Sequence, residues 1–246
     1  LCNFLTKIIT FPVNFLAHQF FLCNTYFMFE QTAEKIKNAK IIPVAKVQEK
    51  EDAIKLARAL TNGGMKAVEI TFRTNDGETG LKKIACCIES IKKEFPNILV
   101  GAGTVINTSL AQKAQNAGAD FLVSPGFNPK TVKWCVEHEV PFFPGVCTPG
   151  EIEQAIEAGL NFLKFFPAEV MGGTKFLKSL AGPFPQTMFI PTGGINAENF
   201  SSYLSCKNVG AVGGSWMCPE NLIKEKKWQE IEKLCEKSNF PRIKNC

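Results

Sequence analysis

Residues 41–73 read IIPVAKVQEKEDAIKLARALTNGGMKAVEITFR, a strand-like run, a helix-like segment and a second strand-like run in succession. Between the two runs, apolar residues recur at helical spacing, at Ala53, Leu56, Ala57 and Leu60. The pair Gly63-Gly64 follows this segment and can adopt the left-handed conformation that ends helices. A strand, a helix and a second strand in this order predict a parallel βαβ unit.

The same alternation of short apolar runs and amphipathic segments continues to residue 216. Eight runs are predicted as strands: Ile41–Val47, Ala67–Arg73, Leu99–Val105, Phe121–Gly126, Pro141–Val146, Phe162–Ala168, Met188–Gly194 and Val209–Trp216. Eight strand–helix units in about 200 residues fit a compact closed barrel, whereas an open doubly wound sheet usually has five or six strands. The sequence therefore predicts an α/β fold, a single (β/α)8 TIM barrel.

Helix ends are marked by capping residues. Thr148-Pro149-Gly150-Glu151 predicts a capping box with proline at the first helical position, and Gly159 is expected to end that helix. Asn107 or Thr108 is the expected N-cap of a second helix, and Asn196 that of a third.

The overall composition excludes several classes of protein. Of 246 residues, 45% are hydrophobic and 21% charged, values typical of a folded globular domain. The net charge of +5 is spread over helix faces, so a nucleic-acid partner is not expected. The ten cysteines form no Cys-x-x-Cys pair, which favours a reduced, cytoplasmic setting. With His18 and His138 as the only histidines, a metal site is not expected either.

Residues 1–29 differ in composition from the rest of the chain. They contain one charged residue, Lys7, and seven of the 21 phenylalanines. The apolar stretch is interrupted by Pro12 and several polar residues, and no small-residue cleavage site follows it. Because Met28 directly precedes an amphipathic helical pattern, we interpret residues 1–27 as an upstream extension of the reading frame and residues 28–246 as the working domain. A signal peptide or a membrane anchor is the alternative.

Two strand segments carry charged side chains where a barrel would bury them. Residues 68–73 alternate strictly, so Glu69, Thr71 and Arg73 share one face. Charged groups on the inside of a barrel are desolvated and are more often functional than structural, although Glu69 and Arg73 could simply pair with each other.

The predicted sixth strand places a single lysine, Lys164, among apolar residues. Burial favours the free amine of a lysine, which can attack a carbonyl carbon to form a Schiff base. The alternative is a side chain that extends from the strand end into solvent.

Glycine-rich turns follow the last two predicted strands. Thr192-Gly193-Gly194 comes after the seventh strand and Gly213-Gly214-Ser215 after the eighth. Barrels frequently bind phosphate in these two loops, because backbone N–H groups at a helix start can point at the anion. Gly101-Ala102-Gly103-Thr104, at the end of the third strand, adds a hydroxyl group beside exposed backbone. The sequence therefore predicts a phosphate site at this end of the barrel.

Taken together, these segments resemble the KDPG/KHG aldolase family. The motifs that carry the resemblance are Glu69–Thr74, Gly101–Val105, Ser124–Gly126, Pro144-Gly145 with Thr148-Pro149, Leu163–Glu169, Pro191–Ile195 and Gly213–Trp216. The similarity extends from about Lys40 to Trp216, and the Lys-Phe-Phe-Pro-Ala-Glu segment is its most specific element. Gly150 departs from the family pattern, which commonly has a hydroxyl residue there.

The resemblance implies a carbon–carbon lyase, a homotrimeric class I aldolase that needs neither a metal nor another cofactor. Such enzymes cleave the phosphorylated keto-deoxy sugar acid 2-dehydro-3-deoxy-6-phosphogluconate (KDPG) to pyruvate and glyceraldehyde 3-phosphate. Many members also cleave 4-hydroxy-2-oxoglutarate (KHG) to pyruvate and glyoxylate. The implied partner is thus a small molecule, and neither nucleic acid nor a membrane.

The resemblance also assigns roles to residues. Lys164 matches the Schiff-base lysine and Glu69 the general acid/base. Arg73 and Thr104 match the contacts to the pyruvate carboxylate, and Phe166 lines the pocket. The remaining substrate-binding positions are Pro125, Thr192, Gly193, Gly194, Gly214 and Ser215, of which Gly193, Gly194 and Ser215 match the phosphate contacts.

Three other functions fit the same sequence. A family member could act on the galactonate isomer, because one inverted hydroxyl need not alter any of these motifs. In another phosphate-binding barrel, such as a sugar-phosphate isomerase or decarboxylase, Lys164 would act electrostatically and form no imine. A membrane-tethered binding protein would use residues 1–29 as its anchor.

Overall fold

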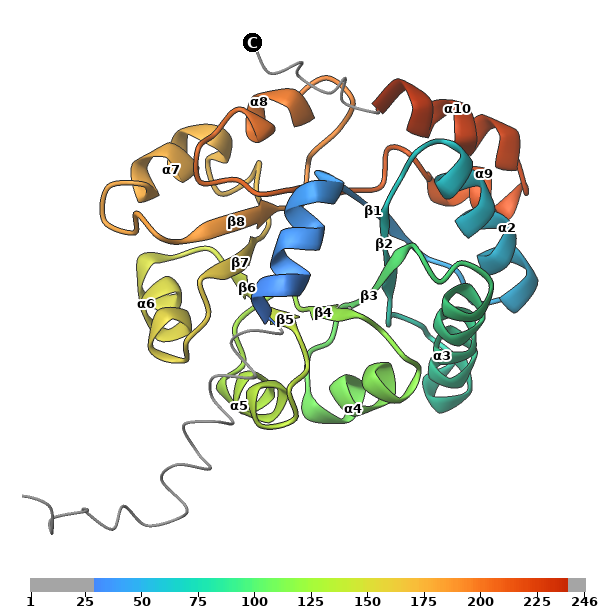
Figure 1. The fold of residues 1–246 in the computed structure, drawn as a ribbon, viewed down its shortest axis with the longest axis horizontal. Coiled ribbons are helices and arrows are strands. Elements are labelled where there is room, and N and C mark those ends of the chain that lie inside the picture. The colour runs from blue at the N-terminus through green and yellow to red at the C-terminus, as the bar shows by residue number, and fades with distance from the viewer. Residues whose placement is uncertain (1–28, 239–246) are drawn as a thin grey trace, which may run out of the picture.

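Parallel strands alternate with helices along residues 29–238, the part of the chain that the structure, a computed structural model, describes. The strands are β1 (Ile41–Ala45), β2 (Ala67–Thr71), β3 (Leu99–Gly103), β4 (Phe121–Val123), β5 (Phe142–Phe143), β6 (Gly145–Val146), β7 (Phe162–Phe165), β8 (Met188–Pro191) and β9 (Val212–Gly214). Figure 1 shows the helices arranged around the outside of these strands. The predicted α/β class is confirmed.

A helix over residues 29–39 precedes β1 and lies across the middle of the strands in Figure 1. The outer helices are α2 (Lys50–Asn62), α3 (Gly77–Glu94), α4 (Thr108–Asn116), α5 (Pro129–Glu137), α6 (Pro149–Glu157), α7 (Gly173–Leu180), α8 (Phe200–Leu204), α9 (Glu220–Lys224) and α10 (Trp228–Ser238). Within residues 29–238, no helix is both long enough and apolar enough to cross a membrane. Residues 1–27, the predicted extension, lie outside the described residues.

The strands pair in two parallel sheets. One sheet has the order β5-β4-β3-β2-β1-β9 and the other the order β6-β7-β8. Isolated parallel bridges, Phe189 with Val209 and Thr192 with Gly213, link β8 to the chain at β9. Each predicted strand contains an observed one, but the observed strands are shorter, and the predicted strand 141–146 is split into β5 and β6 at Pro144. Proline has no N–H group to donate, so it interrupts the hydrogen-bond ladder there.

Alternate residues of the strands belong to two buried clusters. One cluster packs the strands against the outer helices and includes Ile70 and Leu163. The other lies on the opposite strand faces and combines Ala67 and Phe162 with Ile36 of the helix over residues 29–39. Because side chains alternate along a strand, Glu69 shares the face of Ala67, and Lys164 that of Phe162. The two charged side chains therefore belong to the face that is turned away from the outer helices.

The predicted capping box at α6 is confirmed. Thr148 Oγ1 accepts a hydrogen bond from Glu151 N at 3.4 Å, and Glu151 Oε2 accepts one from Thr148 N at 2.9 Å. Asn107 caps α4 as predicted. α8 begins at Phe200, later than predicted, and Asn196 caps the turn that leads into it: its side chain accepts hydrogen bonds from Glu198 N and Asn199 N, and its carbonyl group accepts one from Phe200 N.

Candidate active site

A lysine and a glutamate from two different sheets meet inside the fold. The Nζ atom of Lys164, on β7, lies 3.5 Å from Oε1 of Glu69, on β2, and their side chains are only 7% and 5% exposed. The neighbours of Glu69 in its own sheet are Val44 and Gly101, so the contact with Lys164 crosses the interior rather than following a strand pair. Burial of Lys164 contradicts the alternative in which this side chain extends into solvent. Within residues 29–238, Glu69 pairs with Lys164 and forms no ion pair with Arg73.

Gly103 makes room for the carboxylate of Glu69. A Cβ atom at Gly103 would lie 2.6 Å from Cδ and 2.8 Å from Cγ of Glu69, far inside ordinary van der Waals contact. Gly103 is the register partner of Thr71, two residues beyond Glu69 on β2. The glycine at the end of β3 is therefore required by a side chain of the neighbouring strand.

Phe166 connects Lys164 to the loop after β8. Its ring centroid lies 5.6 Å from Lys164 Nζ, within the range of a cation–π contact. A Cβ atom at Gly193 would lie 3.2 Å from the Phe166 ring and 3.2 Å from Pro167 Cα. The predicted phosphate loop thus packs directly against the segment that carries the lysine.

The loops after β8 and β9 lie side by side. Thr192 forms a parallel bridge with Gly213, and a Cβ atom at Gly213 would lie 2.5 Å from Thr192 Oγ1. Gly193 and Gly194 have φ angles of 99° and 81°, which residues with a Cβ atom rarely adopt. The structure therefore brings together the predicted residues Thr192, Gly193 and Gly194 with Gly214 and the exposed Ser215, which directly follow Gly213.

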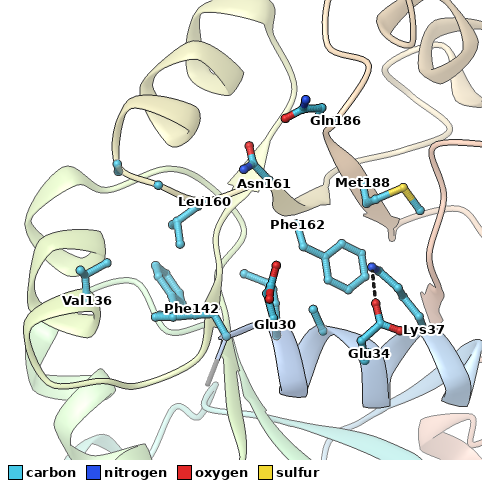
Figure 2. Close-up of a pocket in the computed structure, with 15 residues that line it drawn as sticks. Glu30, Glu34, Lys37, Val136, Phe142, Leu160, Asn161, Phe162, Gln186 and Met188 are labelled. Atoms are coloured by element: carbon cyan, nitrogen blue, oxygen red, sulfur yellow. Dashed lines mark hydrogen bonds and ion pairs between the residues drawn. The ribbon is translucent and has the colours of Figure 1, made fainter. Parts of the chain in front are cut away.

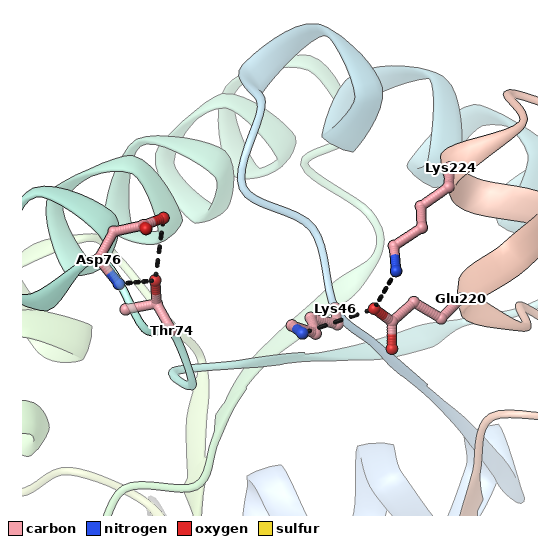
Figure 3. Close-up of polar contacts among 5 residues, drawn as sticks. All are labelled: Lys46, Thr74, Asp76, Glu220 and Lys224. Atoms are coloured by element: carbon pink, nitrogen blue, oxygen red, sulfur yellow. Dashed lines mark hydrogen bonds and ion pairs between the residues drawn. The ribbon is translucent and has the colours of Figure 1, made fainter.

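Arg73 lies past the end of β2 at Thr71 and is exposed, so its predicted burial beside Glu69 and Thr71 is wrong. The adjacent turn is fixed by Thr74, whose Oγ1 accepts a hydrogen bond from Asp76 N at 3.0 Å and donates one to Asp76 Oδ2 at 3.4 Å (Figure 3). A Cβ atom at Gly80 of α3 would lie 2.7 Å from Thr74 Cγ2, so α3 approaches this turn closely. The backbone that follows Arg73 is thereby held in place.

Figure 3 also shows Glu220, at the start of α9, between two lysines of the rim. Its Oε1 lies 3.5 Å from Lys46 Nζ and 2.9 Å from Lys224 Nζ. The side chains of Lys46, Glu220 and Lys224 are 39%, 46% and 72% exposed, so solvent screens both ion pairs and each contributes little to stability.

Two further predicted residues lie at neighbouring strand ends. Thr104 follows β3 with a φ angle of 61°, a conformation that is strained for a β-branched residue and that clusters at functional sites. Pro125 follows β4 in a turn held by Ser124, whose Oγ donates to Gly126 O at 2.7 Å and accepts from Gly145 N at 3.3 Å. The turn packs on β6, because a Cβ atom at Gly145 would lie 2.7 Å from Gly126 N.

Thr71 is a polar residue of this region that is missing from the predicted site residues. It is the last residue of β2 and lies on the same face as Glu69, is 6% exposed, and its Oγ1 has no hydrogen-bond partner within the described part of the chain. Buried hydroxyl groups are normally hydrogen-bonded, so an exception points to a site for a ligand or water. The alternation of residues 68–73 placed Thr71 on this face, and the missing partner is a property of the tertiary structure.

A cavity of about 570 Å³ lies away from these residues (Figure 2). Its lining includes Phe142, Phe162 and Met188, the first residues of β5, β7 and β8, together with residues of the helix over 29–39. Lys164 is two residues further along β7, towards the opposite end of the strands. None of the predicted site residues lines this cavity, so the candidate active site is defined by its chemistry and not by the size of a cavity.

Among the described residues, no group of three or more His, Cys, Asp or Glu side chains is placed to hold a metal ion. The chemical groups present are a buried amine next to a carboxylate, a guanidinium group at the rim and a pair of glycine-rich loops. These groups define the class of protein: a parallel α/β protein with the parts of a Schiff-base enzyme for an anionic substrate.

Comparison with known proteins identifies the family. Residues 32–234 match the family model "KDPG and KHG aldolase". The 2-dehydro-3-deoxy-phosphogluconate aldolase of Treponema pallidum is 42% identical over 205 residues, which cover 83% of this chain and 94% of that protein. The KHG/KDPG aldolase of Escherichia coli is 38% identical over 198 residues, which cover 80% of this chain and 90% of that protein. The chain belongs to the KDPG/KHG aldolase family.

A solved structure shows the same relationship in three dimensions. The crystal structure of KDPG aldolase from Legionella pneumophila, with pyruvate captured at low pH as a covalent carbinolamine intermediate, matches this chain with a TM-score of 0.77 and 40% sequence identity. The match covers 82% of this chain and 95% of that chain.

Proposed function

We propose that this protein is a metal-independent class I aldolase that cleaves KDPG to pyruvate and glyceraldehyde 3-phosphate, and KHG to pyruvate and glyoxylate. The buried pair of Lys164 and Glu69 carries this proposal, because it places the lysine nitrogen 3.5 Å from a carboxylate that can exchange protons during the reaction. The family membership of the chain and the pyruvate carbinolamine of its Legionella relative support it.

The reaction follows from the two groups. The Nζ atom of Lys164 attacks the C2 keto carbon of the substrate, and loss of water from the carbinolamine gives a protonated imine. Glu69 accepts the proton of the C4 hydroxyl while the C3–C4 electron pair moves into the imine, which releases the aldehyde product and leaves an enamine. Glu69 then returns a proton to C3, and hydrolysis of the imine releases pyruvate and restores the amine.

The other site residues bind the two ends of the substrate. Arg73 and Thr104 bind the carboxylate, for which the planar guanidinium group offers two parallel donors. Phe166 and Pro125 line the pocket beside the imine. Gly193, Gly194 and Ser215, in the loops after β8 and β9, bind the phosphate, and Thr192 and Gly214 of the same loops also contact the substrate. The close packing of these two loops supports a shared anion site.

The proposal extends to the assembly and its setting. The bridges between β8 and β9, and the succession of β5, Pro144 and β6, support a closed barrel in which β5 and β6 act as one of eight strands. The resemblance to the family supports residues 28–246 as the working domain, and a homotrimer. The seven cysteines of the described residues are free thiols, which supports a reduced, cytoplasmic setting.

Trapping of the imine tests the proposed chemistry. We expect the full chain, incubated with pyruvate and borohydride, to carry a reduced pyruvate adduct that peptide mapping places on Lys164. Lys164→Ala should lose both the adduct and turnover. Lys164→Arg keeps a cation beside Glu69 without an amine that can form the imine, and it should be equally inactive. Turnover by Lys164→Arg, or an adduct on another lysine, would contradict the mechanism. A panel containing the gluconate and galactonate isomers and KHG then identifies the preferred substrate.

A further inference from the structure

A buried tyrosine binds a glutamate beside the predicted phosphate loop. Tyr203, on α8, is 0% exposed, and its hydroxyl group donates a hydrogen bond to Oε1 of Glu169. Glu169 follows β7 and ends the Lys-Phe-Phe-Pro-Ala-Glu segment, five residues after Lys164. Burial, and then the hydrogen bond to Glu169, raises the pKa of Tyr203, so the hydroxyl group stays protonated and remains a donor.

The side chain of Glu169 packs directly on the loop after β8. A Cβ atom at Gly194 would lie 2.6 Å from both Cβ and Cγ of Glu169. On the other side, a Cβ atom at Gly173, the first residue of α7, would lie 3.2 Å from the Tyr203 hydroxyl oxygen and 3.4 Å from Glu169 Oε1. The pair of Tyr203 and Glu169 therefore fills the space between α8, the start of α7 and the loop after β8.

The backbone of the same segment holds the carbonyl groups of the loop. Thr192 O accepts from Ala168 N at 2.9 Å, and Gly193 O accepts from Glu169 N at 3.1 Å. The next carbonyl group, that of Gly194, accepts from Asn199 Nδ2 at 3.0 Å. Three successive carbonyl groups are thus engaged, which fixes the orientation of the peptide units between them. Fixed peptide units are what an anion site built from backbone N–H groups requires.

We propose that Tyr203 and Glu169 are positioning residues for recognition of the substrate phosphate. Tyr203 fixes the carboxylate of Glu169 against Gly194, and Glu169 in turn keeps the loop in its phosphate-binding shape. The hydrogen bond also restrains the carboxylate of Glu169. Without it, the carboxylate is free to turn towards the bound phosphate and repel it. This inference rests on the proposed function, because it assigns the two residues to the phosphate end of the same substrate.

Kinetics with two substrates test the inference. For Tyr203→Phe, we expect the KM for KDPG to rise about tenfold with kcat changed less than about twofold, since one hydrogen bond to a charged group is lost. The kcat and KM for KHG, which has no phosphate, should stay at the wild-type values. Inhibition by inorganic phosphate should weaken by the same factor as the KM for KDPG rises. A merely structural role would lower the activity towards both substrates together.

Variants of the partner residue sharpen the test. Glu169→Ala should reproduce the effect of Tyr203→Phe, whereas Glu169→Gln, whose amide oxygen still accepts the hydrogen bond, should bind phosphate nearly as well as the wild type. Ser205→Ala removes an exposed hydroxyl group just past the end of α8 and serves as the matched control. The inference would be overturned by unchanged KM values for KDPG in both Tyr203→Phe and Glu169→Ala. Equal losses of activity towards KDPG and KHG would also overturn it.

Failure of the proposed function gives a different result. If the wild type forms no pyruvate adduct, the imine mechanism is wrong. The role of Tyr203 is still decided in that case, because calorimetric titration with inorganic phosphate measures the affinity of the loop without turnover. Equal phosphate affinity in the wild type and Tyr203→Phe would refute the inference.

Discussion

Gly103→Ala is the perturbation whose outcome follows most directly from the structure. The φ angle of Gly103 is outside the left-handed region, so alanine fits the backbone. Its methyl group, however, would lie 2.6 Å from Glu69 Cδ, and ordinary contact begins at 3.4 Å. The carboxylate must therefore retreat by about 0.8 Å, and its Oε1 atom, which is nearer still, must move further.

The displacement acts on the group that moves the proton. Misplacement of a catalytic group by about 1 Å can lower the rate by roughly 100-fold. We expect kcat for KDPG cleavage to fall by about this factor, because Oε1 of Glu69 is also the atom that faces Lys164 Nζ at 3.5 Å. Overpacking should destabilise the fold by roughly 1–3 kcal/mol, which leaves the protein folded at room temperature.

The assay is steady-state release of pyruvate, with thermal unfolding measured on the same samples. Gly101→Ala is the matched control, since its methyl group would overpack β3 against the Phe121 ring, 2.8 Å from Cδ2, instead of against a carboxylate. It should lower stability with a much smaller loss of kcat. Glu69→Asp shortens the carboxylate side chain, so it should lower kcat by a smaller factor in the Gly103→Ala background than in the wild type.

The result that would refute this reasoning is a folded Gly103→Ala protein whose kcat is within about threefold of the wild type. Additive effects of Gly103→Ala and Glu69→Asp would also contradict it, because contact between the two residues requires coupling.

The turn between β6 and α6 gives two further predictions. Thr148→Ala removes the N-cap of α6 and should lower the free energy of unfolding by about 1 kcal/mol, which lowers the Tm by about 2–4 °C. Thr148→Ser keeps a hydroxyl group and should retain most of the wild-type stability. Equal losses of stability in both variants would contradict the capping role. Burial, with a smaller contribution from Glu151, raises the pKa of the Cys147 thiol, so at pH 8 iodoacetamide should modify it more slowly than cysteine in an unfolded peptide. Glu151→Gln keeps the capping box and should speed this reaction; an unchanged rate would count against the influence of Glu151.

Local patterns predicted the parts of this protein that depend on neighbours in the chain. Alternation in residues 68–73 placed Glu69, Thr71 and Arg73 on one face; the structure buries the first two and exposes Arg73, which lies past the end of β2. The threonine–proline–glycine–glutamate sequence at 148–151 predicted the capping box, which depends on atoms within four residues. The order of strand and helix segments predicted the α/β class, because a short connection through a helix favours a parallel pair.

Strand ends were predicted less accurately, because the end of a strand depends on the hydrogen-bond partners that the neighbouring segment provides. The predicted strand 121–126 stops at Val123, where Ser124 binds Gly126 O and Gly145 N instead of continuing the ladder. The predicted strand 141–146 is divided at Pro144 for lack of an N–H group.

By itself, the sequence determined that Glu69 and Thr71 share one strand face and which residues could supply an amine, a carboxylate and anion-binding loops. The tertiary structure alone decided that Lys164 and Glu69, 95 positions apart in the sequence, meet at 3.5 Å, that Gly103 lies against the carboxylate of Glu69, and that Tyr203 binds Glu169. The physical reason is that alternation is fixed by backbone geometry within a few residues. The partner that a side chain meets across the interior is fixed by how distant strands pack together.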